Sequence, residues 1–137
     1  MTIRWKFETR RFLVELETSR DHRYRYDGDD ENGEIQAALD SGEMVAFDST
    51  VSVYLKIDGE LLGQDNLGGS VYYADRIAEF WTAHRDSDPA NRNCSANEYR
   101  VGHYFPDMVR AAIREARDEI RSRLAAAAEL PRIRESA

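Results

Sequence analysis

Apolar and polar side chains alternate over residues 3–16, which is the spacing of a strand with one buried face. The apolar set occupies odd positions before residues 9–11 (Ile3, Trp5 and Phe7) and even positions after them, from Phe12 onward. A shift of one residue turns every side chain to the opposite face of a sheet. The change of phase therefore needs either a bulge near residues 9–11 or two separate strand segments. We expect one bent strand.

The clearest strand pattern follows Met44. Six apolar side chains occupy odd positions with polar side chains between them: Val45, Phe47, Val51, Val53, Leu55 and Ile57. Asp58 and Gly59 come next, and this dipeptide is a strong hairpin signal because both residues tolerate the positive φ of a primed turn. The sheet is therefore expected to be largely antiparallel.

Three segments have helical spacing of apolar residues, at 34–42, 74–84 and 105–130. Gly42 is placed to end the first segment and Pro131 to end the last. We expect an α+β fold, in which an antiparallel sheet of three to four strands is covered on one face by the long C-terminal helix and the shorter 74–84 helix.

The composition suits one soluble domain spanning residues 1–137. The chain has 137 residues, of which 42% are hydrophobic and 33% charged, and this length can bury a core without disulfides or a structural metal. Its N-terminus has no apolar block typical of a secretory signal. Cys94 is the only cysteine, which agrees with a reducing compartment. Arginine outnumbers lysine by seventeen to two, a bias typical of a GC-rich bacterial or phage genome. We expect a cytoplasmic protein in a bacterial host cell.

The net charge of −7 is unevenly distributed. Residues 1–26 carry seven basic and four acidic side chains, residues 27–98 carry four basic and sixteen acidic ones, and residues 99–137 carry eight basic and six acidic ones. An acidic middle repels nucleic acid, whose phosphates require Lys and Arg, and it attracts basic protein surfaces. Direct binding of nucleic acid is therefore disfavoured.

The acidic middle leads to our first functional hypothesis, a protein that docks on a basic partner and blocks nucleic-acid binding there. The acidic face would be drawn from residues 27–65 and 86–98, and the candidate contacts are seven of its carboxylates: Asp27, Asp29, Asp30, Glu31, Glu34, Asp86 and Asp88. Complementary charge would speed the encounter and make it sensitive to salt. The simpler alternative is that these charges only keep a small domain soluble.

Two other hypotheses remain open. Cys94 and His103 could form a thiolate–imidazole pair that Asn93 or Asn97 orients, but no catalytic signature surrounds the cysteine, and the same residues serve as ordinary caps and turns. We expect no enzymatic activity. The third hypothesis is a homodimeric assembly or regulatory module that associates through an exposed sheet edge.

Two apparent motifs fail at a required position, and a third candidate is outweighed by the charge that follows it. Residues 63–70 match a phosphate loop except that Gly69 stands where the lysine belongs. Residues 27–38 begin like a calcium loop but place Ala38 where a glutamate is needed. The basic and aromatic residues 22–26 could stack on bases, but five acidic residues follow closely. The three histidines are far apart, so we predict no metal site and no cofactor.

Several segments resemble small proteins carried by prophages, plasmids and other mobile elements of Gram-negative bacteria. They are Leu67-Gly-Gly-Ser-Val-Tyr72, His84-Arg-Asp86, Asn93-Cys-Ser95 and, above all, Gly102-His-Tyr-Phe-Pro-Asp-Met-Val-Arg-Ala-Ala-Ile-Arg-Glu-Ala-Arg117. The resemblance implies an accessory protein of a mobile element and supplies no catalytic residues. Such elements encode inhibitors of host defence, including anti-CRISPR proteins, some of which are acidic domains that occupy nucleic-acid-binding surfaces. A CRISPR effector complex is therefore one candidate partner.

Overall fold

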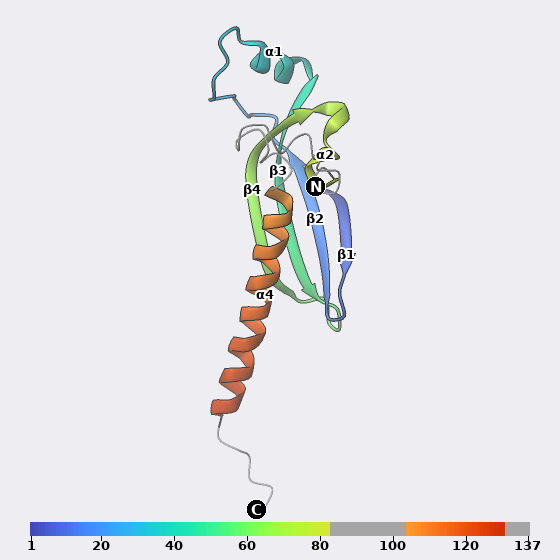
Figure 1. Ribbon diagram of the computed structural model, residues 1–137, viewed down its shortest axis with the longest axis vertical. Helices are drawn as coiled ribbons and strands as arrows, with labels where there is room; N and C mark the ends of the chain where they lie inside the picture. The colour runs from blue at the N-terminus through green and yellow to red at the C-terminus, as the bar shows by residue number, and fades with distance from the viewer. Residues whose placement is uncertain (83–103, 131–137) are drawn as a thin grey trace, which may run out of the picture.

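The computed structural model describes residues 1–82 and 104–130. Its four strands form one antiparallel sheet in the order β1-β2-β3-β4: β1 (Thr2–Glu8), β2 (Phe12–Arg20), β3 (Met44–Leu55) and β4 (Leu61–Tyr73). The helical segments are α1 (Glu34–Ser41), the 3₁₀ turn η1 (Ala74–Arg76), α2 (Glu79–Thr82) and α4 (Tyr104–Glu129). Figure 1 shows α4 running along the sheet, with α1 beyond one end of it. The expected α+β fold is confirmed.

Residues 9–11 form a hairpin turn, so the expectation of a single bent strand is wrong. The amide of Thr9 donates to the carbonyl of Phe12 at 2.9 Å, and the amide of Phe12 donates to the Thr9 hydroxyl at 3.0 Å. In the resulting register Trp5 lies opposite Leu16, and Phe7 lies opposite Val14. Paired residues share a face of the sheet, so a three-residue turn brings Trp5 and Phe7 to the same side as the even positions of β2. A shift of register between Ile3 and Trp5 pairs Ile3 with Glu17 instead.

The β3–β4 hairpin is confirmed, although its turn differs from the primed type expected. Gly59 has φ 74°, but Asp58 does not adopt a positive φ. The Gly59 amide donates to the carbonyl of Leu55 at 2.7 Å, and the Asp58 carboxylate accepts the Glu60 amide at 3.0 Å. The strand thus ends before Ile57, whose side chain is 88% exposed. The last apolar position of the alternating pattern belongs to the turn.

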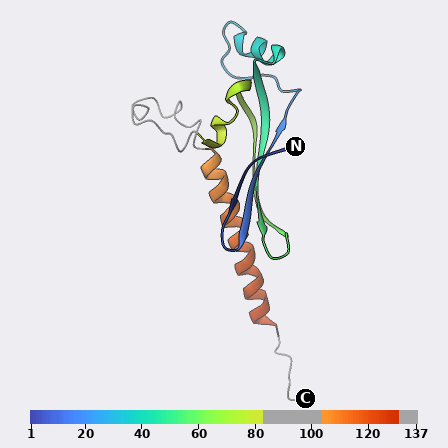
Figure 2. The ribbon, with the colours of Figure 1, turned by 90° about the vertical axis from the view of Figure 1, so that its right-hand side faces the viewer.

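Helix α4 packs against β3 and β4 on one face of the sheet (Figure 2). Its approach is close at Gly63 of β4, where an added Cβ would lie 2.1 Å from the carbonyl oxygen of Ala112 and 2.8 Å from the amide of Ala116. Both alanines are fully buried. Small side chains on the helix and none on the strand therefore set the distance between the two layers.

The segment expected to be one helix over residues 74–84 begins as η1 and continues as the single turn of α2. Bonds from the amides of Phe80 and Trp81 to carbonyls three residues earlier keep it tightly wound. Its apolar residues Ile77, Phe80 and Trp81 nevertheless pack in or against the core, as their helical spacing predicts. Phe80 is buried with its ring edge-on to Phe47 at 5.5 Å and 6.2 Å from Phe105.

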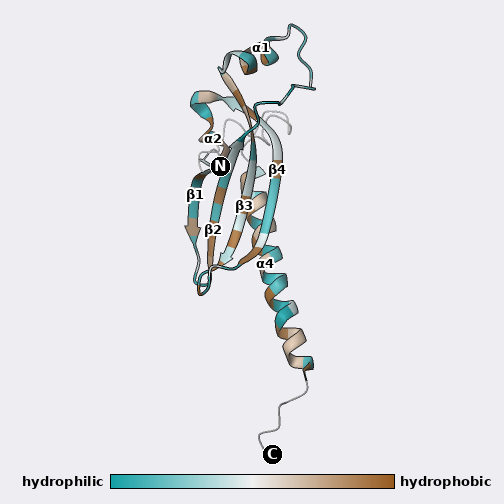
Figure 3. Cartoon of the chain, turned by 180° about the vertical axis from the view of Figure 1, so that it is seen from behind, coloured by the Kyte–Doolittle hydropathy of each residue, from teal (hydrophilic) through white to brown (hydrophobic). Residues whose placement is uncertain are grey.

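The opposite face of the sheet is not covered by any helix of the described residues, as the view from behind shows (Figure 3). Polar side chains there bond across strands. The Thr50 hydroxyl lies 2.7 Å from the Asn66 side-chain oxygen, and the Gln64 amide donates to the Ser52 hydroxyl at 3.0 Å. Cross-strand pairs of this kind satisfy polar groups on a sheet face without a second apolar layer.

Candidate functional site

The candidate acidic segment lies in the connection between β2 and β3, at the end of the sheet that also carries α1 (Figure 1). The connection is tied to the sheet at its start, where the amide of Asp21 donates to the carbonyl of Ala46 at 2.9 Å. Tyr24 then lies against β4, since a Cβ at Gly69 would be 3.3 Å from its ring. These two contacts hold the start of the connection, from Asp21 to Tyr24, against β3 and β4.

Asp30 organises this connection. Its two carboxylate oxygens accept the amides of Ile35 at 3.0 Å and Gln36 at 3.1 Å, and its carbonyl accepts the amide of Gly33 at 3.0 Å. The first amides of a helix have no partner within it, so a carboxylate in this position caps α1 and favours its N-terminal end electrostatically. Asp30 therefore has a structural role that the sequence did not indicate.

Gln36 joins the loop to the helix. Its side-chain oxygen accepts the amide of Tyr26 at 2.9 Å, and its side-chain nitrogen donates to Asp40 at 2.9 Å. The expected short helix and its Gly42 end are confirmed, with Gly42 at φ 85°. Hydrogen bonds thus anchor Tyr26 and Gln36 on either side of the acidic run, residues 27–34. Most carboxylates of the run are exposed to solvent.

Four carboxylates of the run share the same environment. They are exposed, and none forms an ion pair with any residue of the ranges 1–82 and 104–130: Asp27, Asp29, Glu31 and Glu34. Within the connection, Arg25 pairs with Asp40 at 3.6 Å, and none of the four carboxylates takes part in that pair. Their charge is therefore open to solvent and to a partner. The charge of Asp27 also affects the Tyr24 hydroxyl. Burial first, and then Asp27, raise the pKa of this phenol.

The acidic surface does not extend as one face over residues 27–65. Asp58 and Glu60 lie in the turn at the opposite end of β3, and Glu60 is bound by Arg123 of α4, whose Nη1 donates to Glu60 Oε2 at 2.9 Å. This hydrogen bond lowers the pKa of the Glu60 carboxyl. Asp48 is also engaged, accepting the amide of Gly69 at 3.2 Å. Among the exposed carboxylates without an ion pair in residues 1–82 and 104–130, four lie within eight positions of one another in the β2–β3 connection, whereas others, such as Asp75, Glu115 and Glu129, are scattered along the chain.

The first part of the same connection is basic. Arg20, His22, Arg23 and Arg25 line a hollow of about 530 Å³ between the loop, α1 and the start of β3, where Asp21 and Asp40 supply the only two carboxylates among its lining residues. Tyr24, the central aromatic residue of the 22–26 patch, is only partly exposed. The connection therefore carries positive charge where it leaves β2 and negative charge where it reaches α1, a division that net charge alone conceals.

The remaining predicted sites divide into two groups. Asp86, Asp88, Cys94 and His103 lie outside the described residues. Residues 63–70, which imitate a phosphate loop, lie within β4, where Gly69 (φ 69°) sits beside an irregularity in the pairing with β3. Such a loop needs to lie between a strand and a helix N-terminus, which this segment does not.

Within its described part, the chain has neither a metal-binding cluster of side chains nor a helix that could span a membrane. Residues 1–82 and 104–130 contain no group of three or more His, Cys, Asp or Glu side chains placed to hold a metal ion. None of the helices in those ranges combines the length and the apolar character that a membrane span requires. Strands β1 and β4 form the two edges of the sheet, and pairing of copies through either edge stays a prediction.

Comparison with protein-family models, with curated proteins and with solved structures finds no match to this chain.

Proposed function

We propose that this protein docks on a basic surface of a host nucleic-acid-binding protein and inhibits it by occupying that surface. Asp27, Asp29, Glu31 and Glu34 make the charged contacts, while Asp30 holds their backbone in place. The observation that carries the proposal is that these four exposed carboxylates lie within eight positions of one another and have no counter-ion among the described residues, whereas Glu8 and Glu60 are paired.

The anchoring of the segment supports the same function. A flexible acidic loop would lose conformational entropy on binding, whereas this one is held by the side chains of Asp30 and Gln36 at both flanks. Carboxylates presented this way match the spaced Lys and Arg side chains of a nucleic-acid-binding surface. Together with the resemblance to mobile-element proteins, this favours an anti-defence inhibitor, with an anti-CRISPR protein as its most specific form.

The direct test compares two variants with equal loss of charge. D27N/D29N/E31Q removes three carboxylates of the acidic segment and spares Asp30 and Glu34, which lie at the start of α1. D75N/E115Q/E129Q removes three exposed carboxylates elsewhere that have no ion pair among the described residues. Equal melting temperatures would show that both variants fold.

Each protein is used to capture partners from a Gram-negative host extract, and the captured protein is then purified for binding and DNA-competition measurements. We expect the first variant to bind about 100-fold more weakly, because three exposed charge contacts of up to about 1 kcal/mol each are lost. The control variant should bind within about twofold of the unmodified protein. The unmodified protein should displace DNA from its partner, and 0.5 M salt should weaken the complex.

Two results would disprove the proposal. One is a partner that still binds DNA while the protein is bound to it. The other is equal affinity of D27N/D29N/E31Q and the unmodified protein. The anti-CRISPR form is tested separately by plating a targeted phage on hosts with active CRISPR immunity. Plating should rise with the unmodified protein and the control variant but not with D27N/D29N/E31Q.

A further inference from the structure

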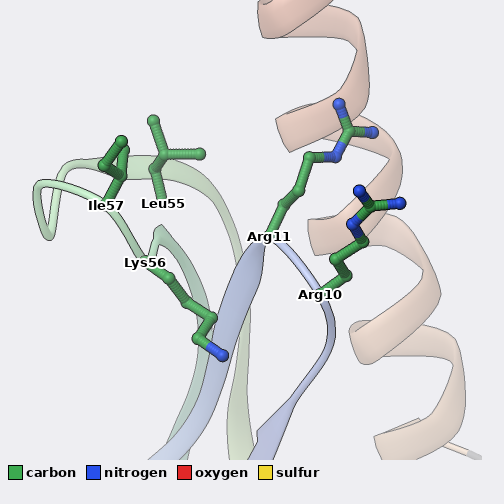
Figure 4. A pocket seen from close by; sticks show the side chains of 5 residues that line it. All are labelled: Arg10, Arg11, Leu55, Lys56 and Ile57. Atoms are coloured by element: carbon green, nitrogen blue, oxygen red, sulfur yellow. The ribbon is translucent and has the colours of Figure 1, made fainter.

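A second hollow lies at the end of the sheet opposite the acidic segment. It has a volume of about 880 Å³ and is lined by five residues of the β1–β2 and β3–β4 turns (Figure 4): Arg10, Arg11, Leu55, Lys56 and Ile57. The two turns are joined by a backbone bond from the amide of Lys56 to the carbonyl of Arg11 at 2.8 Å. The backbones of the two turns that carry the lining residues are therefore held side by side.

The charge in this hollow is positive and only partly neutralised. Lys56 is paired with Glu8 at 3.3 Å. Arg10 and Arg11 form no ion pair with a residue of the ranges 1–82 and 104–130, and the Arg11 guanidinium rests 5.6 Å from the ring centre of Phe12. Figure 4 shows both arginines extending along the α4 side of the turn, with Lys56 directed away from them. Two adjacent guanidinium groups without a carboxylate favour binding of an oxyanion.

The other wall of the hollow is apolar. Leu55 and Ile57 project from the β3–β4 side, and Ile57 is almost fully exposed to solvent. An exposed apolar side chain beside unpaired cations matches a ligand that has an anionic group at one end and an apolar or flat body at the other. Nucleotides have this chemistry, because a phosphate is linked through a sugar to a ring whose face contacts aliphatic side chains.

We infer that this hollow binds a phosphate-bearing ligand of the nucleotide class, with Arg10 and Arg11 holding the phosphate and with Leu55 and Ile57 covering the base. The volume lies in the range of small-molecule sites, about 300–1,000 Å³. A small ligand with two or three charges is more compatible with the net charge of −7 than a long nucleic-acid strand, which needs many cationic contacts. The site is separate from the acidic segment and does not depend on the proposed function.

The test is an NMR titration of the full chain with inorganic phosphate, ADP and a short oligothymidylate. ADP should cause saturable shifts at the amides of Arg10, Arg11 and Ile57, with an affinity at least about tenfold above that of inorganic phosphate. R10Q/R11Q should weaken ADP binding at least about tenfold, because charge-assisted bonds to the phosphate are lost. I57S should weaken ADP binding about threefold and leave inorganic phosphate binding unchanged.

The matched control is R114Q/R117Q, which removes two exposed arginines of α4 that have no ion pair among the described residues. It should bind ADP like the unmodified protein. Oligothymidylate that binds more tightly than ADP, and loses this binding in R10Q/R11Q, would support the site and assign its phosphate to a nucleic-acid strand. The inference is overturned if ADP causes no saturable shift at the turn residues, or if both arginine variants weaken ADP binding equally.

Discussion

The two ends of the sheet differ in whether basic side chains neutralise their carboxylates. At the turn end, Glu60 is bound by Arg123, and Glu8 is paired with Lys56. At the α1 end, Asp27, Asp29 and Glu31 have no such partner within the described ranges. The 12 residues of β3 separate these ends by roughly 36 Å, more than the Debye length of about 8 Å at physiological salt, so the charges of one end hardly affect the other.

This difference shows why net charge is a poor guide to a binding surface. The acidic middle of the chain contributes residues to both ends, and at the turn end one of them, Glu60, pairs with Arg123 of the C-terminal helix. Only the carboxylates that the fold leaves unpaired remain for a partner.

The largest effect is expected for Gly63→Val, which acts on the frame that holds both ends. Its side chain would overlap the backbone of α4 at Ala112, so the helix must move away from the sheet. We expect a loss of about 3 kcal/mol or more in the free energy of unfolding, measured by denaturant titration. Gly59→Ala is the control, because no atom lies within 4 Å of a Cβ there and only the strain of its positive φ is added. Equal losses in the two variants would contradict the close approach of helix and strand.

A smaller effect is expected for Asp30→Ala at the α1 end. This variant removes the acceptor of two amides at the start of α1 and should lower the free energy of unfolding by about 1–2 kcal/mol. Asp29→Ala, which removes a neighbouring exposed carboxylate without a helix contact, should change it by less than about 0.5 kcal/mol. Amide hydrogen exchange should localise the change in the first variant to α1. Unchanged exchange there would contradict the capping role.

Alkaline pH should weaken the core between the ends through Tyr72. Burial, followed by the charge of Glu79 and by Tyr104, raises the pKa of this phenol from 10.0 to about 12. Because the folded state disfavours the phenolate, the contribution is complete below pH 10 and is lost as the pH rises through about 12. We expect Tyr72→Phe to flatten this part of the stability–pH curve, measured by thermal melting. A curve with the same slope in the variant would assign the loss to other groups.

The smallest effect is expected at the turn end in acid. The hydrogen bond from Arg123 lowers the pKa of Glu60 below its ordinary value of 4.5. The pair therefore stabilises the fold above that value and loses its contribution as the pH falls through the lowered pKa. Both groups are exposed, so solvent screens the pair and the change is small. Glu60→Gln should show a weaker acid dependence in thermal melting than the unmodified protein, and an identical dependence would contradict the pairing.

Much of the fold could be predicted from periodicity. Alternation identified β3 and its buried face, and helical spacing identified α4 and α1, because each pattern records which side chains of one segment face the core. The hairpin at residues 9–11 was missed, since a change of phase has the same appearance for a bent strand and for two paired strands. The division of the 74–84 segment into η1 and α2 was missed because periodicity records only which side chains face the core. Phe80 packs against Phe47 and Phe105 in this segment, as it would in one continuous helix.

The sequence by itself determined most of the elements, their apolar faces and the place where acidic residues are concentrated, because these depend on neighbours a few positions apart. Only the tertiary structure decided which charges are available. Glu60 meets Arg123 across 63 positions, Asp30 meets amides beyond a turn, and Arg10 and Arg11 reach a hollow shared with another hairpin. Charge pairing depends on distances of a few ångströms between side chains, and these distances exist only after the strands and helix have packed.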